Sequence, residues 1–417
     1  MKRILLVVAM LSLAGTASAV MDVPSGGWDQ ALNITANTTI DLSQAITGTW
    51  DTQPAGYVAG KGIYDPEKWA IVFHYTSVTV ASGVTLKFTN HPANPPVVWL
   101  VEGAVLINGV VNLNGQYMND GVNGEAIGGP GGFKGGRRGT ADGGNGGGFG
   151  PGGGTRAAAN GQNAGGGGYG TAGGSTSVPG GATYGNVAIL PLIGGSGGGG
   201  TYVRNGGGGG GGAILVAAQL SIGVVGQLTA IGGGCQTSGG SGSGGAIRLI
   251  APEVHCSGSI LATGGPTTGG VGGKGRIRIE ANLQDLNGYL DPATASVVDP
   301  GDTPLFWPES STPMVRVVSL NGIPVPSDPR GSLVYPHHDT FLSGAGDVTT
   351  VLEAANFPID GTLEVYIVKQ GGARTQLPTS SVTLIGGSSA LSTWQAVFPA
   401  VNNGMYAIQA RAVLPNP

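Results

Sequence analysis

Short apolar segments that recur at a nearly constant spacing between runs of glycine constrain the fold of this chain most strongly. Residues 214–218 (ILVAA), 247–251 (IRLIA) and 277–281 (IRIEA) start 33 and 30 residues apart. A second motif follows them at residues 226–232 (GQLTAIG) and 258–264 (GSILATG), and residues 109–115 (GVVNLNG) are an earlier copy. Because such units bury an apolar face only against the next repeat, the pattern predicts two strands per repeat, stacked in parallel.

The period of two within each segment predicts which side chains face the core. Ile214, Ile247 and Ile277 are expected to stack inward on one another. Leu215, Arg248 and Arg278 hold the alternate positions and are expected to face outward.

Glycine dominates the chain between these segments, and most of its 83 glycines lie between Gly115 and Gly275. Residues 116–211 form a glycine-rich insertion in which only residues 186–193 look like a core strand. Runs such as residues 128–136 (GGPGGFKGG) suggest polyproline-II-like segments laid side by side, where missing side chains permit close backbone approach. Ordered packing and a disordered insertion are both compatible with the sequence.

In these repeats the chain resembles glycine-rich exported bacterial proteins of the right-handed parallel β-helix, or pectate-lyase-like, superfamily. The resemblance covers roughly residues 70–290 and implies an all-β solenoid over residues 71–292, with residues 20–70 as its N-terminal cap. Enzymes of this superfamily use clustered Asp residues, or Lys or Arg with acidic calcium ligands. Neither constellation is found in this sequence.

The first residues predict export. Lys2 and Arg3 precede an apolar run and the small residues Ala17-Ser18-Ala19, as in a signal peptide of residues 1–19. We expect no transmembrane segment after cleavage, because no later apolar stretch is long enough to span a bilayer.

Composition changes after Pro292. Spaced prolines in residues 293–313 predict a linker, and residues 314–417 contain six or seven short apolar segments separated by turn residues. That pattern resembles an immunoglobulin-like β-sandwich.

Low charge narrows the range of partners. Only 10% of residues are charged and the formal net charge is −4, which argues against nucleic acid as a partner. Cys235 and Cys256 could form a disulfide after export, or Cys256 could be a small buried residue. We expect no cofactor and no metal, and we interpret residues 337–339 (HHD) as an exposed polar loop.

Six side chains are candidates for ligand binding. Arg248 and Arg278 hold equivalent positions in successive repeats with Arg276 beside them, and a basic row could bind anionic polysaccharide. Tyr169, Tyr184 and Tyr202 of the glycine-rich region could stack on sugars, or merely cover glycine backbone.

Catalysis has weaker support. Asp120, Glu125 and Asp142 lie in glycine-rich loops, where solvated carboxylates are the simpler interpretation than a paired acid and base. We therefore expect a secreted or cell-surface structural or adhesive protein without catalytic activity, whose partners are polysaccharide or cell-envelope components. The alternatives are a polysaccharide lyase or glycoside hydrolase, and an ice- or mineral-binding protein.

Overall fold

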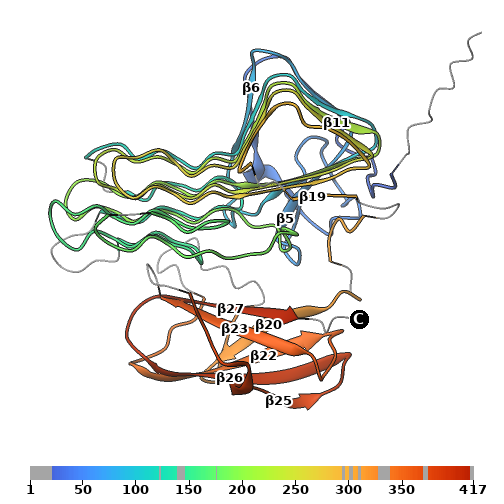
Figure 1. Ribbon diagram of the computed structural model, residues 1–417. Coiled ribbons are helices and arrows are strands. Elements are labelled where there is room, and N and C mark those ends of the chain that lie inside the picture. The colour runs from blue at the N-terminus through green and yellow to red at the C-terminus, as the bar shows by residue number, and fades with distance from the viewer. Residues whose placement is uncertain are drawn as a thin grey trace, which may run out of the picture.

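In the part of the chain that the structure describes, the regular secondary structure is β-strand, apart from the 3₁₀ turns η1 (Leu42–Gln44) and η2 (Thr379–Ser381). A computed structural model describes residues 21–121, 124–138, 146–174, 176–293, 296–299, 304–308, 311–326, 339–369 and 374–413. The expected signal peptide lies outside these ranges. In the part of the chain that is described, no helix is long and apolar enough to cross a membrane. Figure 1 shows parallel strands that continue into glycine-rich rows, and an antiparallel unit formed by the C-terminal strands.

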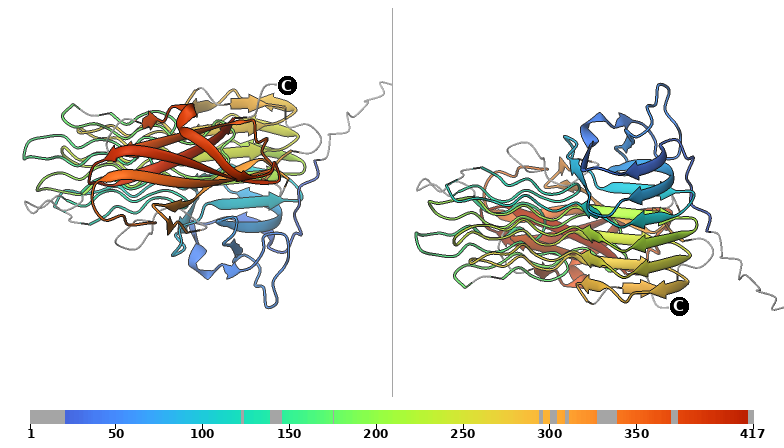
Figure 2. Two further views of the ribbon diagram at one scale, coloured as in Figure 1. Left: turned by 90° about the horizontal axis from the view of Figure 1, so that it is seen from below. Right: turned by 90° about the horizontal axis from the view of Figure 1, so that it is seen from above.

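The parallel strands come in sets of three, and each strand pairs with its counterpart in the next set. The sets are β7 (Val97–Val101), β8 (Val105–Ile107) and β9 (Val110–Asn112); β10 (Ala213–Ala218), β11 (Ser221–Val224) and β12 (Gln227–Thr229); β13 (Ala246–Ile250), β14 (Glu253–Cys256) and β15 (Ser259–Leu261); and β16 (Arg276–Glu280), β17 (Leu283–Asp285) and β18 (Tyr289–Asp291). The first two strands of every set belong to a 13-stranded sheet and the third to a 6-stranded sheet. Figure 2 shows the sets stacked side by side.

The predicted stacking and its register are confirmed. Ile214 pairs with Ile247, and Ile247 with Ile277, in parallel strands. The second motif stacks in the same way, with Leu228 between Val111 and Ile260. Each repeat has three strands rather than the expected two, because the short strands β11, β14 and β17 lie between the two motifs.

The resemblance to the right-handed β-helix superfamily is wrong. The two parallel sheets curl around a shared apolar core into a half-barrel (Figure 1). After its third strand the chain does not return directly to the next repeat. It first makes a glycine-rich excursion, for example over residues 230–245 between β12 and β13. The physical reason is that glycine rows, not a further strand, fill that side of the repeat.

The outer face of the large sheet is also covered, which corrects the expectation that alternate side chains face solvent. Leu215 is 1% exposed and belongs to a second apolar cluster with Val98, Ile250 and Tyr184. Phe306 of the expected linker joins the same cluster, so this part of the linker packs against the sheet. Burial on both faces explains why β7, β10 and β13 are continuously apolar at nearly every position.

The glycine-rich insertion is an ordered array of rows. The Gly198 amide donates to the Gly208 carbonyl at 2.9 Å, the Gly208 amide to Gly240 at 2.9 Å, and the Gly240 amide to Gly199 at 2.8 Å. Rows from separate excursions thus exchange backbone hydrogen bonds. A Cβ atom built on Gly210 would lie 1.9 Å from the Gly195 carbonyl oxygen, so only glycine fits there. Residues 186–193, expected as a core strand, instead form a turn that buries Ile189 and Leu192.

The C-terminal residues form two antiparallel sheets around their own core, as the short apolar segments predict. One sheet has the order β21 (Ile323–Pro324), β20 (Met314–Leu320), β22 (Gly346–Ala355), β26 (Leu391–Val401) and β25 (Val382–Gly387), and the other has β24 (Arg374–Gln376), β23 (Thr362–Lys369) and β27 (Tyr406–Val413). Phe357, Trp394 and Phe398 anchor the core between them.

The cap is built on β1 (Gln30–Ile34), β2 (Thr38–Asp41), β3 (Ile46–Thr47) and β4 (Ile63–Asp65), which lead to β5 (Ala70–Val80) and β6 (Thr85–Thr89). Strands β1 and β2 pair in parallel with β5 and β6 and so cover the first repeat. The last strand of the large sheet, β19 (Ser296–Val298), pairs with β16 at the opposite end.

Buried polar groups hold the cap to β5. The ring of His74 is 1% exposed, its Nε2 donates to the Trp50 carbonyl at 2.6 Å, and its Nδ1 accepts from the Gly26 amide at 3.1 Å. Asp29 accepts from the His74 amide at 2.7 Å. This arrangement requires a neutral imidazole, and burial lowers the pKa of His74 below its ordinary value of 6.5.

Protonation of His74 is therefore expected to loosen the cap. Since the unfolded chain takes up this proton more readily, the stabilisation from His74 is complete above about pH 6.5 and is lost as the pH falls through the lowered pKa. We expect the melting temperature of the native protein to fall between about pH 7 and about pH 5, and His74→Gln to remove part of that fall. His255→Gln, at a partly exposed site, is the control and should keep the native slope. An unchanged slope in His74→Gln would contradict the assignment.

Candidate functional site

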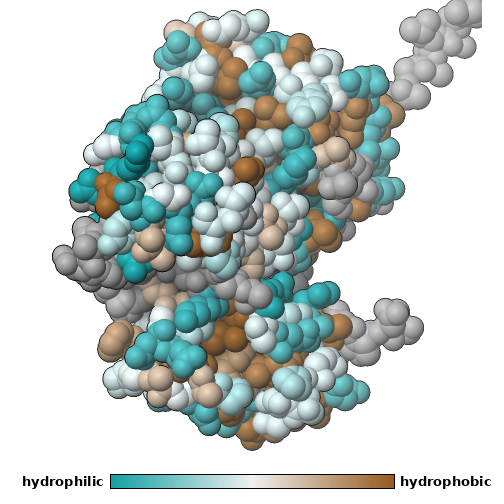
Figure 3. Space-filling view, turned by 60° about the vertical axis from the view of Figure 1, so that its left-hand side comes forward, coloured by the Kyte–Doolittle hydropathy of each residue, from teal (hydrophilic) through white to brown (hydrophobic). Residues whose placement is uncertain are grey.

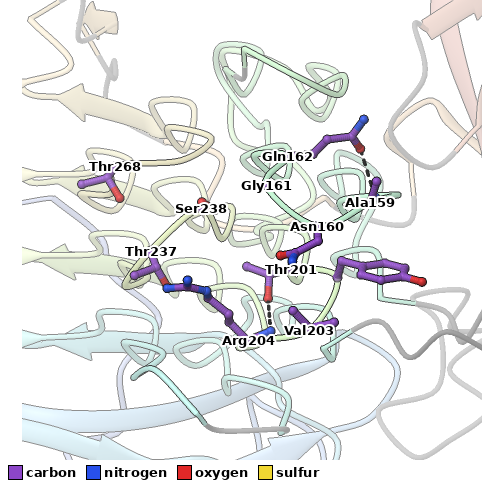
Figure 4. A pocket seen from close by; sticks show the side chains of 11 residues that line it. Ala159, Asn160, Gly161, Gln162, Thr201, Val203, Arg204, Thr237, Ser238 and Thr268 are labelled. Carbon is purple, nitrogen blue, oxygen red and sulfur yellow. Dashed lines mark hydrogen bonds between the residues drawn. The ribbon is translucent and has the colours of Figure 1, made fainter.

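A polar hollow lies where four tips of the glycine rows meet. Its volume is about 260 Å³, and residues 159–162, 201–204, 237–238 and 268 line it. We call it the distal hollow, because it lies at the ends of the glycine rows away from the strands (Figure 4). Hydrophilic residues gather over this end of the molecule, which comes forward in Figure 3. Segments far apart in the sequence thus form one surface.

Internal hydrogen bonds fix the shape of the tips. The Thr201 hydroxyl accepts from the amides of Arg204 at 2.9 Å and Asn205 at 2.8 Å, which closes the 201–205 turn. Asn205 is fully buried, and its Nδ2 donates to the Gln236 carbonyl of the neighbouring tip at 2.6 Å. The Gln162 side chain accepts from the amides of Ala158 and Ala159. The tips are therefore pre-organised and tied to one another.

Two consecutive residues at the hollow hold an unusual backbone conformation. Thr237 and Ser238 have φ angles of +39° and +38°. Non-glycine residues rarely adopt such angles, and a β-branched residue such as threonine does so least readily. Backbone outliers of this kind concentrate at binding and catalytic sites, because the surrounding structure must enforce them.

Four side chains around the hollow are free to meet a ligand. The amide of Asn160, the guanidinium of Arg204 and the hydroxyls of Ser238 and Thr268 have no side-chain hydrogen bond or ion pair with any described residue. They come from four different tips. The Arg204 side chain points across the hollow towards Thr237 (Figure 4). Donors converging from several rigid segments are suited to a polar ligand with several hydroxyl groups.

Sequence reasoning predicted only Tyr202 among the residues of the hollow. It missed Asn160, Arg204, Ser238 and Thr268. A signal was present, because short segments with polar side chains, such as residues 201–205 (TYVRN), interrupt the glycine runs. Which tips come together depends on how the rows pack, and no periodicity encodes that.

The row of arginines that was expected to bind anionic polysaccharide is not exposed. Arg248 and Arg278 do pair in register, but Arg248 is only 3% exposed. Its Nε contacts the Glu280 carboxylate at 2.8 Å, and its terminal nitrogens donate to the carbonyls of Leu305 and Phe306. Arg278 contacts the same carboxylate at 2.6 Å. Both arginines pair with Glu280, and Arg248 also binds the segment 304–308, which covers this part of the outer face of the sheet.

Two of the three tyrosines are core residues. Tyr169 and Tyr184 are 1% and 3% exposed, and their ring centroids are 4.6 Å apart. Arg276 lies over the Tyr169 ring at 5.4 Å and donates to the Tyr184 carbonyl at 2.9 Å. Tyr169, Tyr184 and Arg276 therefore cover glycine backbone and the sheet, which was the simpler of the two interpretations of the tyrosines. The two tyrosine rings are too buried to stack on sugars.

The loop carboxylates and the cysteines have structural surroundings. Glu125 pairs with Lys134 at 3.4 Å and Arg137 at 2.8 Å, Asp120 accepts from the Thr237 hydroxyl at 3.4 Å, and Asp142 lies outside the described residues. Both cysteines are buried and free. Burial raises the pKa of the Cys235 thiol to about 12, so this group stays protonated near neutral pH.

Within the described ranges, no three His, Cys, Asp or Glu side chains gather as metal ligands would. His337 and His338 lie outside those ranges.

Comparisons with protein families, with curated proteins and with solved structures find no match to this chain. For the C-terminal unit, the structure shows two antiparallel sheets around one core and no closer likeness to an immunoglobulin-like module.

The buried arginine gives a prediction about stability. Arg248→Ala removes a buried partner of Glu280 and leaves the carbonyls of Leu305 and Phe306 without their donor, so we expect the free energy of unfolding to fall by about 3 kcal/mol. Arg316→Ala breaks an exposed pair with Glu353 and should cost about 1 kcal/mol or less. Urea unfolding followed by tryptophan fluorescence measures both, and equal costs would contradict this account of Arg248.

Proposed function

We propose that this chain is an exported surface protein that binds carbohydrate at the distal hollow and does not cleave it. The observation that supports this most is the convergence of Asn160, Arg204, Ser238 and Thr268, all unengaged, on tips that buried hydrogen bonds hold in place. Sugar hydroxyls both donate and accept hydrogen bonds, and these four side chains offer both kinds of partner.

The scaffold suits adhesion. Rows joined by backbone hydrogen bonds keep the tips from collapsing, so binding need not order flexible loops. The residues that line the hollow include one aromatic ring, Tyr202, which could pack against a sugar face. The signal peptide expected at residues 1–19 would deliver the chain out of the cell.

The proposal is tested with the intact protein on a panel of immobilised polysaccharides, with and without calcium, measuring both retention and the release of new chain ends. We expect retention of the protein and no new chain ends. Asn160→Ala/Ser238→Ala should weaken retention at least about fivefold, because a net hydrogen bond contributes about 1 kcal/mol. Release of new chain ends would show that the protein cleaves the polysaccharide, which would contradict the proposal.

A matched control separates the site from the general surface. Asn403→Ala/Ser389→Ala removes the same two side-chain types from exposed positions of the C-terminal sheets and should leave retention unchanged. Equal losses in the two double variants would show that the hollow is not the binding site.

A further inference from the structure

Positive charge is concentrated around the distal hollow, although the whole chain has a net charge of −4. Arg204 lines the hollow and is exposed. Arg138 reaches the neighbouring tip, where its Nη1 lies 3.5 Å from the Val203 carbonyl oxygen. Arg156 precedes Ala157, whose amide donates to the Gly200 carbonyl at 3.0 Å, directly before the 201–205 turn. Three arginines from separate rows of the long insertion between β9 and β10 therefore lie close to one surface.

Neither Arg138 nor Arg204 makes an ion pair with a carboxylate that the structure describes. Glu125 already contacts Lys134 and Arg137. Asp120 accepts from the Thr237 hydroxyl at 3.4 Å, and its backbone amide donates to the Gln236 side chain at 2.9 Å. The guanidinium of Arg204 makes no ion pair with any residue that the structure describes.

We propose that the ligand of the distal hollow is an acidic polysaccharide, whose carboxylate or sulfate groups are bound by Arg204, Arg138 and Arg156. This inference rests on the proposed function and adds the charge class of the ligand. A guanidinium offers two parallel donors to an anionic group, which makes arginine better suited than lysine to such contacts. The hydroxyls of Ser238 and Thr268 belong to the same lining and can bind the sugar that bears the acid.

A polymer fits this arrangement better than a single small anion. The three arginines lie around residues 138, 156 and 204 of the same insertion, each at or near the tip of its own row. A chain with an acidic group on successive sugars can meet them together, and linked contacts add affinity without a deep pocket.

The experiment compares two polymers that differ only in charge: polygalacturonate and its fully methyl-esterified form. We expect the intact protein to be retained on polygalacturonate, at least about tenfold less on the ester, and less at high salt than at low salt. Arg138→Gln/Arg156→Gln/Arg204→Gln should lose at least about tenfold in retention on polygalacturonate.

The control is Lys87→Gln/Arg316→Gln/Lys369→Gln, which removes the same charge from exposed positions remote in sequence from the tips and should bind like the native protein. Arg204→Gln alone, at an exposed and unpaired side chain, keeps the test decisive should the triple variant fold poorly.

The outcomes separate the two proposals. Equal retention of both polymers, with no effect of the arginine variants, would overturn the acidic ligand and leave carbohydrate binding standing. Retention of neither polymer, together with failure on the wider polysaccharide panel, would overturn both. Equal retention of single-stranded DNA would show a nonspecific polyanion surface and would also overturn the acidic polysaccharide.

Discussion

The absence of side chains along the glycine rows is the constraint on which the rest of the structure depends. Adjacent rows lie so close that a Cβ atom on Gly210 or Gly240 would sit 1.9 Å from a carbonyl oxygen of another row. That closeness lets backbone amides and carbonyls of different excursions bond to one another, as Gly208 does with Gly240. Buried backbone groups must find partners, and here the rows supply them without forming helix or sheet.

The rows and the half-barrel support each other. Each glycine excursion begins and ends at a strand, so the in-register pairing of β10, β13 and β16 sets the spacing at which the rows leave the sheets. The turns of the rows in return bury the outer face of the large sheet with Tyr169, Tyr184 and Leu192. Polar residues are thereby concentrated at the distal tips, where Asn160, Arg204 and Ser238 surround the hollow.

The sequence was sufficient for the strands and their register, because Ile214, Ile247 and Ile277 repeat with the spacing of the stack. It was insufficient for everything that depends on how the excursions pack. Arg248 looks like an outward residue by alternation, yet the segment 304–308 covers it. The known-family resemblance failed for a related reason: spacing shows that repeats stack, but not what fills the third side of each repeat. A glycine has no side chain whose size or polarity would indicate which residues lie next to it, so the set of residues that line the hollow could not be predicted.

The account depends most on the glycine rows being an ordered, hydrogen-bonded scaffold rather than a flexible insertion. Amide hydrogen exchange of residues 194–212 in the native protein tests this directly, since Gly198, Gly208 and Gly210 each donate to another row. We expect these amides to exchange at least about a thousandfold more slowly than in an unfolded chain, comparably to those of β10, because both open only with the scaffold. Exchange at the rate of an unfolded chain, with β10 still protected, would contradict the account.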